Sequence, residues 1–453
     1  MNNSRIDSLL VALYFLSARL LRFRSRPLLQ AWQRFRIRRF LRRNLPRLPY
    51  YGQVATQDTE SLPIIDKQVM LAYFEQFNSA GIRLEDATTR ALEAESSRNF
   101  RPELNGVTVG LSSGTQGPRG AFMVSHRERL KWAGIMLARV LTPAMLMQLL
   151  LGRRPLKVAF FMRANSNLYT TLASRRIDFR FYDLLDGMEQ HLASLQSHAP
   201  DILVAPSRAL GWIAGVQLEG RLNLAPAKLI AVAEVLEPDD RRRAEQAFGR
   251  SVHQLYQCTE GFLAYTCSHG VLHMNEEYVY IEQEWLDEQR TRFTPVITDF
   301  TRSTQHFIRY RLNDVLRVRK EPCPCGNAAL ALDAVEGRSD DILWLPALNG
   351  NQLRPLFPDA VRHAVSIVPA ALPDYRIEQH GDLFHIASDG DDQRAYGLIA
   401  VALGQAAQRH GMQAPICVQT MFTPPAQHAK RRRIVCIKRA EPDHQPDCLI
   451  DHA

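Results

Sequence analysis

Short apolar runs alternate with longer amphipathic segments through the middle of the chain. Three runs, at residues 157–162, 201–205 and 227–233, are five to seven residues long and are bounded by turn residues. Segments that could be helices separate them. This alternation predicts an α/β fold with a mainly parallel sheet.

The pattern differs on either side of this middle part. Apolar positions at helical spacing predict helices over 65–100 and 128–150, and the run at 106–110 predicts a strand. From about 270 to 345 short strands are expected, for example at 278–282, 293–298 and 307–311. After about 340 the pattern is α+β and ends in a basic strand at 431–438.

These changes predict four parts. They are basic N-terminal helices (1–60), a core (61–340) with a small β-rich subdomain at about 262–335, a small C-terminal α+β domain (341–440), and a loose tail (441–453). With 453 residues the chain is long enough to bury large cores without disulfides.

The net charge of +9 is unevenly distributed. Residues 1–50 hold twelve arginines and a single acidic residue, Asp7, whereas the rest of the chain is slightly acidic. A nucleic-acid-coating surface spread over the protein is therefore not expected.

The basic N-terminal segment has two interpretations. Its apolar run from residue 8 is too short to span a bilayer, and no cleavage site of a signal peptide follows it. The helices either pack on the body and expose their arginines, or lie as basic amphipathic helices on anionic lipid or an acidic partner. The seven cysteines are too few and too scattered for a disulfide framework, which favours a reducing cytoplasm.

A Gly- and Ser-rich stretch follows the predicted strand at 106–110. Its small residues Ser112, Ser113, Gly114, Thr115 and Gly117 could wrap a phosphate, because glycines allow close backbone approach and successive N–H groups form an anion nest. It lacks the Gly-Lys-Ser/Thr of a P-loop. A plain surface turn is the alternative.

Three further motifs carry candidate chemistry. In the motif at 255–261, Tyr256 could stack on a base, Thr259 could reach a phosphate, and Glu260 could hold Mg²⁺. In the segments 295–301 and 307–314, an aspartate could accept hydrogen bonds from ribose hydroxyls. The alternative is that it forms a surface salt bridge with Arg309 or Arg311. The fourth motif, at 336–343, is typical of a domain junction but also of a charged turn.

These four motifs occur in the order found in adenylate-forming enzymes, and the chain resembles that superfamily over nearly its whole length. It is most similar to the branch of phenylacetate–CoA ligases and coenzyme F390 synthetases, because residues 307–311 and 337–341 are close to the motifs of that branch. The resemblance implies a large α/β body and a small mobile C-terminal cap domain. It also implies an AMP-forming acid–thiol ligase that uses ATP and Mg²⁺, forms an acyl-adenylate and passes the acyl group to a thiol.

The resemblance also implies roles for residues. Ser112, Ser113, Gly114, Thr115 and Gly117 would hold the β- and γ-phosphates, Tyr256 would stack on adenine, and Ala233 and Glu234 would line the purine. Thr259 would touch the α-phosphate, Glu260 would bind Mg²⁺, Asp314 would bind the ribose, Arg338 would lie near ribose or phosphate, and Asp340 would be the hinge. A catalytic Lys from the C-terminal domain corresponds to Lys430, with a solvated basic turn as the alternative.

The sequence departs from the family pattern at several positions. Gln116 replaces a Thr, Gln257 replaces a Gly, and Ala429 replaces the Gly before the lysine. The loop is one residue shorter than usual, and Arg119 stands near the place of its lysine. Altered or lost turnover would follow if these positions are essential.

Four residues form a candidate zinc site in the β-rich subdomain. Cys323 and Cys325 lie in a Cys-x-Cys-Gly turn, and Cys267 and His273 could complete a tetrahedral Cys₃His set with a structural role. His269 is a rival fourth ligand, and four unlinked residues are the alternative. Cys258 lies in the nucleotide motif and is not expected to be a ligand.

The expected partners are a carboxylic acid and either CoA or the phosphopantetheine of an acyl carrier protein, with no nucleic acid. The residues around 160–169 are expected to line the acid pocket, and their apolar character suits an aryl or fatty acid or plain core packing. Two other functions remain open, namely adenylation with amide or acyl-enzyme formation, and a nucleotide-binding partner without turnover. A homodimer is one oligomeric state left open by the resemblance.

Overall fold

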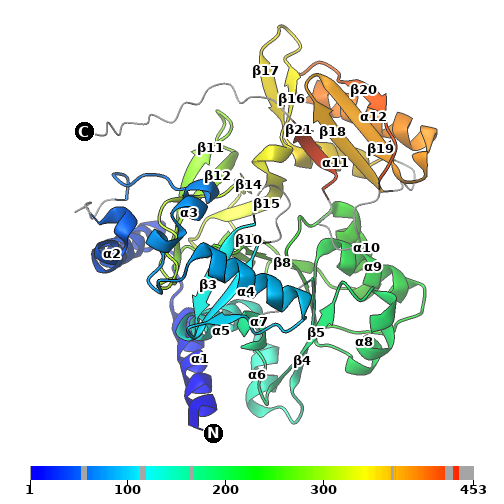
Figure 1. The fold of residues 1–453 in the computed structure, drawn as a ribbon. Helices are drawn as coiled ribbons and strands as arrows, with labels where there is room; N and C mark the ends of the chain where they lie inside the picture. Colours follow the sequence, from blue (N-terminus) through cyan, green and yellow to red (C-terminus); the bar gives the residue numbers. More distant parts are fainter. Residues whose placement is uncertain are drawn as a thin grey trace. The chain divides into compact units, whose positions relative to one another are not determined.

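The computed structural model describes residues 2–52, 59–112, 119–163, 167–368, 372, 374–423 and 432–437 (Figure 1). The chain divides into two compact units, the first ending at Val335 and the second starting at Glu336. Each unit has an apolar core of its own.

The first unit contains a large sheet with a parallel half. Its strands lie in the order β5-β4-β6-β7-β8, and each neighbouring pair is parallel. The bounds are β4 (Leu156–Met162), β5 (Ile177–Asp183), β6 (Ile202–Ala205), β7 (Lys228–Ala231) and β8 (Val252–Gln257). The three apolar runs of the sequence are therefore β4, β6 and β7, which confirms the α/β prediction.

The two faces of this parallel half are buried against different elements, as period-2 side-chain alternation requires. Phe161, Leu203 and Ala231 pack in the core cluster that contains α8 (Leu192–His198), α9 (Ser207–Leu218) and α10 (Pro238–Phe248). Phe160 and Val204 point to the opposite face and join the main core.

The other half of the sheet is antiparallel. It contains β9 (Phe262–Thr266), β10 (Leu272–Met274), β11 (Val279–Trp285), β12 (Arg292–Asp299), β13 (Tyr310–Arg311), β14 (Asp314–Val318) and β15 (Ala331–Arg338). Because β9 pairs antiparallel with β8, the strands of residues 262–335 extend the parallel half instead of forming a sheet of their own.

The two N-terminal helices, α1 (Asn2–Leu20) and the Arg-rich α2 (Arg26–Asn44), pack on the first unit. Helix α1 lies against α5 (His126–Val140), and α2 buries an apolar face that includes Leu29, Ile37 and Leu41. Among the helices that the structure describes, none combines the length and the apolar character of a membrane-spanning segment.

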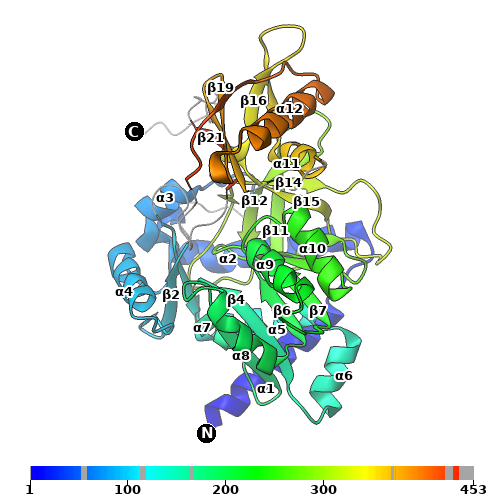
Figure 2. The same ribbon diagram turned by 90° about the vertical axis from the view of Figure 1, so that its right-hand side faces the viewer.

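A small sheet completes the first unit. It contains β1 (Glu103–Leu104), β2 (Val107–Leu111) and β3 (Ala121–Ser125), and α4 (Leu84–Ser96) packs against it (Figure 2). Helices α3 (Lys67–Ala72) and α7 (Asn167–Thr170) are short.

Two predicted helices are interrupted. The segment 128–150 divides into α5 and α6 (Pro143–Leu151), because Thr142 caps α6 by accepting a hydrogen bond from the Met145 N–H and Pro143 starts the new helix. The segment 65–100 breaks between α3 and α4, where the amide of Asn78 bonds the Phe74 and Ile82 carbonyls.

The second unit is an α+β domain. Its four-stranded sheet has the order β20-β19-β18-β21, with β18 and β19 antiparallel and both outer pairs parallel. The bounds are β16 (Leu343–Pro346), β17 (Leu353–Leu356), α11 (Pro358–Ser366), β18 (Tyr375–His380), β19 (Leu383–Ser388), α12 (Gln393–Arg409), β20 (Ile416–Gln419) and β21 (Ile434–Ile437).

Candidate functional site

The motif residues of the first unit lie at the carboxyl ends of parallel strands. Ala233 and Glu234 follow β7, and Tyr256 is in β8 just before the turn that carries Thr259 and Glu260. In open α/β sheets ligands bind at this edge, outside the carboxyl ends of the strands. Asp314, at the start of β14, is brought to the same place by the sheet.

Tyr256 and Asp314 are in direct contact. The Tyr256 hydroxyl donates a hydrogen bond of 2.5 Å to the Asp314 carboxylate, across 58 residues of sequence. Burial raises the pKa of Tyr256 well above its ordinary value, so the phenol stays protonated and remains a donor. Sequence motifs at 255–261 and 307–314 therefore meet at one point.

Glu260 has two hydroxyl partners. The Thr259 hydroxyl donates to a Glu260 carboxylate oxygen at 2.7 Å, and the phenol of Tyr310 is a second hydrogen-bond partner. A carboxylate beside neutral hydroxyls offers the hard oxygen atoms that Mg²⁺ prefers, so these residues fit the ion. Burial raises the pKa of the neighbouring Cys258 thiol well above its usual range, which makes it unreactive.

The turn that carries Thr259 and Glu260 has supports that the motif analysis missed. The Arg302 guanidinium donates to the Thr259 carbonyl at 3.1 Å. A Cβ on Gly261 would lie 2.8 Å from the buried Asp299 carboxylate, so a larger residue there would have to displace this carboxylate. Asp299 accepts bonds from the backbone and hydroxyl of Thr301, and burial raises its pKa.

Ala233 adopts a left-handed backbone conformation with φ of 66°. Residues other than glycine take this conformation at a cost, and such positions cluster at ligand sites. The neighbouring Glu234 carboxylate accepts a bond of 3.5 Å from the Arg208 N–H of α9.

The Gly-rich stretch is described only at its two ends. Ser113, Gly114, Thr115 and Gly117 lie outside the described residues, as does Lys430 of the second unit. At the ends, the Ser112 hydroxyl accepts from the Gly120 N–H at 2.8 Å. Arg119 makes two hydrogen bonds to Glu95 at 2.6 and 2.7 Å, so its guanidinium is already paired.

The Arg-Tyr-Arg segment and the junction motif also have defined partners. Arg309 pairs with Glu282 at 2.7 Å and Arg311 pairs with Glu284 at 2.6 Å, so both arginines form ion pairs with glutamates of β11. The alternative interpretation, a salt bridge from an aspartate of these segments to Arg309 or Arg311, stays a prediction. Arg338 and Asp340 belong to the second unit, where the Arg338 N–H donates to Asp341.

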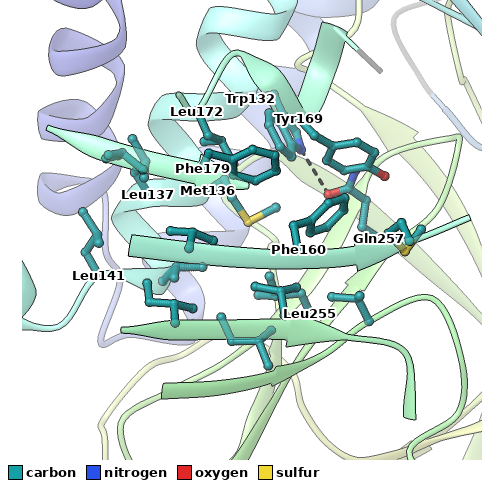
Figure 3. A pocket seen from close by; sticks show the side chains of 18 of the residues that line it. Trp132, Met136, Leu137, Leu141, Phe160, Tyr169, Leu172, Phe179, Leu255 and Gln257 are labelled. Atoms are coloured by element: carbon teal, nitrogen blue, oxygen red, sulfur yellow. Dashed lines mark hydrogen bonds between the residues drawn. The ribbon is translucent and has the colours of Figure 1, made fainter. Parts of the chain in front are cut away.

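An apolar pocket of about 880 Å³, including its open mouth, lies beside the Tyr256 motif (Figure 3). Its walls come from α5, the parallel strands and α7, with Gln257 and Tyr169 at one end and Leu137 and Leu141 at the other. The Trp132 indole donates to the Gln257 amide oxygen at 3.1 Å. Phe160 and Tyr169, expected at an acid pocket, both line it.

Cys267, His273, Cys323 and Cys325 come together, with all four candidate ligand atoms within 4.8 Å of one another. The Cys267 and Cys323 sulfurs are 3.7 Å apart, and the Cys325 sulfur is 3.4 Å from His273 Nε2. Sulfurs of a tetrahedral zinc site lie about 3.8 Å apart at a Zn–S distance of about 2.3 Å, so the cluster fits this ion.

The second ring nitrogen of His273 supports the same interpretation. His273 Nδ1 lies 3.2 Å from the Ala329 carbonyl and can donate to it, which leaves the Nε2 lone pair directed at the cluster. His269 and Cys258 are not part of the cluster.

No family model matches the chain, and no curated protein matches it. Solved structures do match. A 2-hydroxyisobutyryl-CoA ligase, in complex with R3-HIB-AMP in the postadenylation state, is 15% identical with a TM-score of 0.58, over 90% of this chain and 89% of the ligase.

Two other solved structures show the same likeness. An acyl acid amido synthetase is 12% identical with a TM-score of 0.54, over 91% of this chain and 92% of the synthetase. An anthranilate CoA ligase in complex with anthranoyl-AMP is 12% identical with a TM-score of 0.50, over 71% of this chain and 64% of the ligase. At these identities the likeness is one of fold, and the protein has the fold of the adenylate-forming enzymes.

Proposed function

We propose that this protein activates an apolar carboxylic acid with ATP and Mg²⁺, forming an acyl-adenylate and pyrophosphate, and then transfers the acyl group to a thiol. The observation that supports it best is the position of the apolar pocket. Ala233, Leu255 and Gln257 line the pocket, and Tyr256, Thr259 and Glu260 lie in or next to the same segments. A carboxylate at this end would lie beside the phosphate-binding groups.

The lining suits a long hydrocarbon tail. Leu156, Val158, Phe160 and Met162 are alternate residues of β4 and all line the pocket, so it follows the strand for about 20 Å at about 3.3 Å per residue. No Lys, Arg, Asp or Glu is among the lining residues of this pocket. An aryl acid would fill only the end nearest Gln257, whereas a fatty acid would fill the length.

The nucleotide would be held by the residues that the resemblance implies. In this proposal Ser112, Ser113, Gly114, Thr115 and Gly117 hold phosphates, Ala233, Glu234 and Tyr256 line the base, and Asp314 binds the ribose. Thr259 and Glu260 bind the α-phosphate and Mg²⁺, and Lys430 and Arg338 act from the second unit with Asp340 as hinge. Such preorganised donors stabilise charge that develops where two anions react.

The acceptor is proposed to be the thiol of CoA or of a carrier protein. The structural neighbours include CoA ligases, matched over 90% and 71% of this chain, and an acyl acid amido synthetase, matched over 91% of it. An amine acceptor is therefore the second candidate. AMP release that needs CoA or a carrier would favour the thiol, and release that needs an amine would favour the amide.

Carboxylate-dependent exchange of pyrophosphate into ATP tests the proposal. With saturated acids of increasing length, kcat/KM should rise about fourfold per methylene until the pocket is full, since each buried methylene contributes about 0.8 kcal/mol. Glu260→Gln and Asp314→Ala should lower exchange at least a hundredfold. Glu284→Gln, at a surface salt bridge with Arg311, is the matched control and should exchange normally.

Absence of exchange with every acid of an aliphatic and aryl panel would overturn the catalytic proposal. ATP binding without exchange would instead indicate a nucleotide-binding partner, the reading that the altered Gly-rich loop favours.

We also propose that the Cys₃His cluster binds a structural Zn²⁺ that ties β9 and β10 to the turn at Cys323 and Cys325. Four protein ligands leave no open position for a substrate. None of the six described cysteines is in a disulfide, which suits a reducing compartment such as the cytoplasm.

A further inference from the structure

Helix α1 exposes a continuous apolar stripe. Its residues recur at intervals of three and four, which places them on one face of the helix. They are Ile6, Leu9, Leu13, Leu16 and Leu20, with exposed fractions of 55%, 61%, 53%, 54% and 83%. The opposite face is held by α5, where Gly134 allows close contact with Val11, Tyr14 and Phe15.

Helix α6 exposes a second apolar group, formed by Met147, Leu150 and Leu151 at 55%, 62% and 74%. In both ribbon views α1 and α6 project from the same end of the first unit (Figures 1 and 2). We call this end, formed by α1, α6 and the adjoining loops at 152–155 and 173–176, the basal surface. Isolated exposed leucines are ordinary, but this many large apolar side chains at one end are not.

Basic side chains accompany these apolar groups. Arg153, Arg175 and Arg176 are exposed in the adjoining loops, and Arg5, Arg22 and Arg24 are exposed at the two ends of α1. Of the neighbouring acids, Asp201 is paired with Arg154 at 2.7 Å, and Asp7, which is 3.0 Å from His126, is outnumbered by these arginines. The basal surface therefore has an excess of positive charge.

We infer that the basal surface docks on an anionic lipid bilayer, with the α1 stripe and the α6 group in the interface and the arginines on lipid headgroups. Apolar side chains flanked by Arg are the pattern of helices that lie in a membrane interface. A second copy of the chain is a poorer occupant, because it would bring the same arginines face to face.

Docking there would also serve the apolar pocket. Leu141, Leu156 and Ile177 line the end of the pocket away from Gln257, and they adjoin α6 and the two basic loops. The docking inference itself does not depend on any activity of the pocket.

Flotation of the full-length chain with lipid vesicles tests the inference. We expect binding to vesicles that contain phosphatidylglycerol, little binding to pure phosphatidylcholine, and weaker binding as salt increases. Leu9→Gln, Leu13→Gln and Leu16→Gln together should weaken binding more than tenfold with the helix intact, since Gln is about as good a helix former as Leu.

The matched control variant replaces three exposed aliphatic residues outside the basal surface. They are Leu92, Ile367 and Val401, which are 47%, 52% and 60% exposed. Changing these three to Gln should leave vesicle binding unchanged. Arg153→Glu with Arg175→Glu should remove the preference for anionic lipid, whereas Arg394→Glu with Arg409→Glu should not.

Three outcomes would overturn the inference. They are no flotation of the wild-type chain with anionic vesicles, equal flotation of the α1 triple variant, and equal effects of the test and control triples. A dimer in sedimentation that the α1 triple variant abolishes, without vesicle binding, would assign this surface to a second copy instead.

Discussion

His306 is buried beside α2, 2% exposed, with its ring 6.0 Å from that of Phe40. Neither ring nitrogen has a hydrogen-bond partner among the described residues. Burial lowers the pKa of His306 to about 4, so the folded protein holds this imidazole neutral.

This burial predicts a loss of stability in acid. Between pH 6.5 and 4 the unfolded chain protonates His306 and the folded chain does not, so its stabilising contribution, full above pH 6.5, is lost as the pH falls toward 4. The loss is up to about 3 kcal/mol at 1.36 kcal/mol per pH unit. His306→Phe should flatten the dependence of the unfolding free energy on pH in this window.

Denaturant unfolding at several pH values would measure this effect. If the unfolding free energy of His306→Phe falls between pH 6.5 and 4 as steeply as that of the wild type, the expected role of the buried ring is contradicted.

Ala233 gives a second prediction for a single residue, because its left-handed φ of 66° strains an alanine but not a glycine. Ala233→Gly should stabilise the protein by about 1 kcal/mol. Ala231→Gly, two residues earlier in a buried strand, should destabilise it. If thermal unfolding shows that both variants change the stability in the same direction, the backbone φ of residue 233 does not determine the effect.

At the scale of elements, the contact of α1 with α5 depends on Gly134. A Cβ there would lie 2.5 Å from the Tyr14 Cβ and 2.8 Å from the Val11 carbonyl oxygen. Gly134→Ala should therefore push α1 outward, cost about 1–3 kcal/mol and speed proteolysis within α1. Gly215→Ala in α9, whose nearest atom would be 3.9 Å away, should be neutral or slightly stabilising.

The Cys₃His cluster joins elements that are 50 residues apart in sequence. Cys323→Ser with Cys325→Ser should reduce bound zinc from about one equivalent to none and lower the thermal midpoint, as a strong chelator should do in the wild type. Cys417→Ser in the second unit should change neither quantity. Elemental analysis that finds no zinc in the purified wild type would refute the site.

At the scale of the whole molecule, the second unit has its own buried core and internal contacts, as an independently folding domain does. Its core contains Leu343, Ile377, Phe384, Ile399 and Leu403, all fully buried. The buried Arg362 donates to the Glu336 carbonyl at 2.6 Å, and Arg432 pairs with Asp341.

A fragment that starts at Val335 should therefore fold alone, with a cooperative thermal transition and dispersed amide resonances. A fragment that starts at Leu343 keeps the core but removes Glu336 and Asp341, which accept hydrogen bonds from Arg362 and Arg432. It should be less stable by a few kcal/mol, because each of these two guanidinium groups loses one acceptor. Two equally stable fragments would show that the segment 336–341 adds nothing to this unit.

The sequence by itself determined the fold class and the order of the motifs. The runs at 157–162, 201–205 and 227–233 became adjacent parallel strands, since a short apolar run between helical segments has few other ways to bury both faces. It also identified Cys267, His273, Cys323 and Cys325, because few residue types bind zinc.

Only the tertiary structure decided what depends on contacts between distant residues. It shows that Tyr256 donates a hydrogen bond to Asp314, that Arg119 pairs with Glu95, and that Arg302 donates to the Thr259 carbonyl. It also divided the 128–150 helix at Pro143 and left the α1 stripe uncovered. Periodicity shows that a face is apolar, but the packing of other elements determines whether that face is buried or left for a partner.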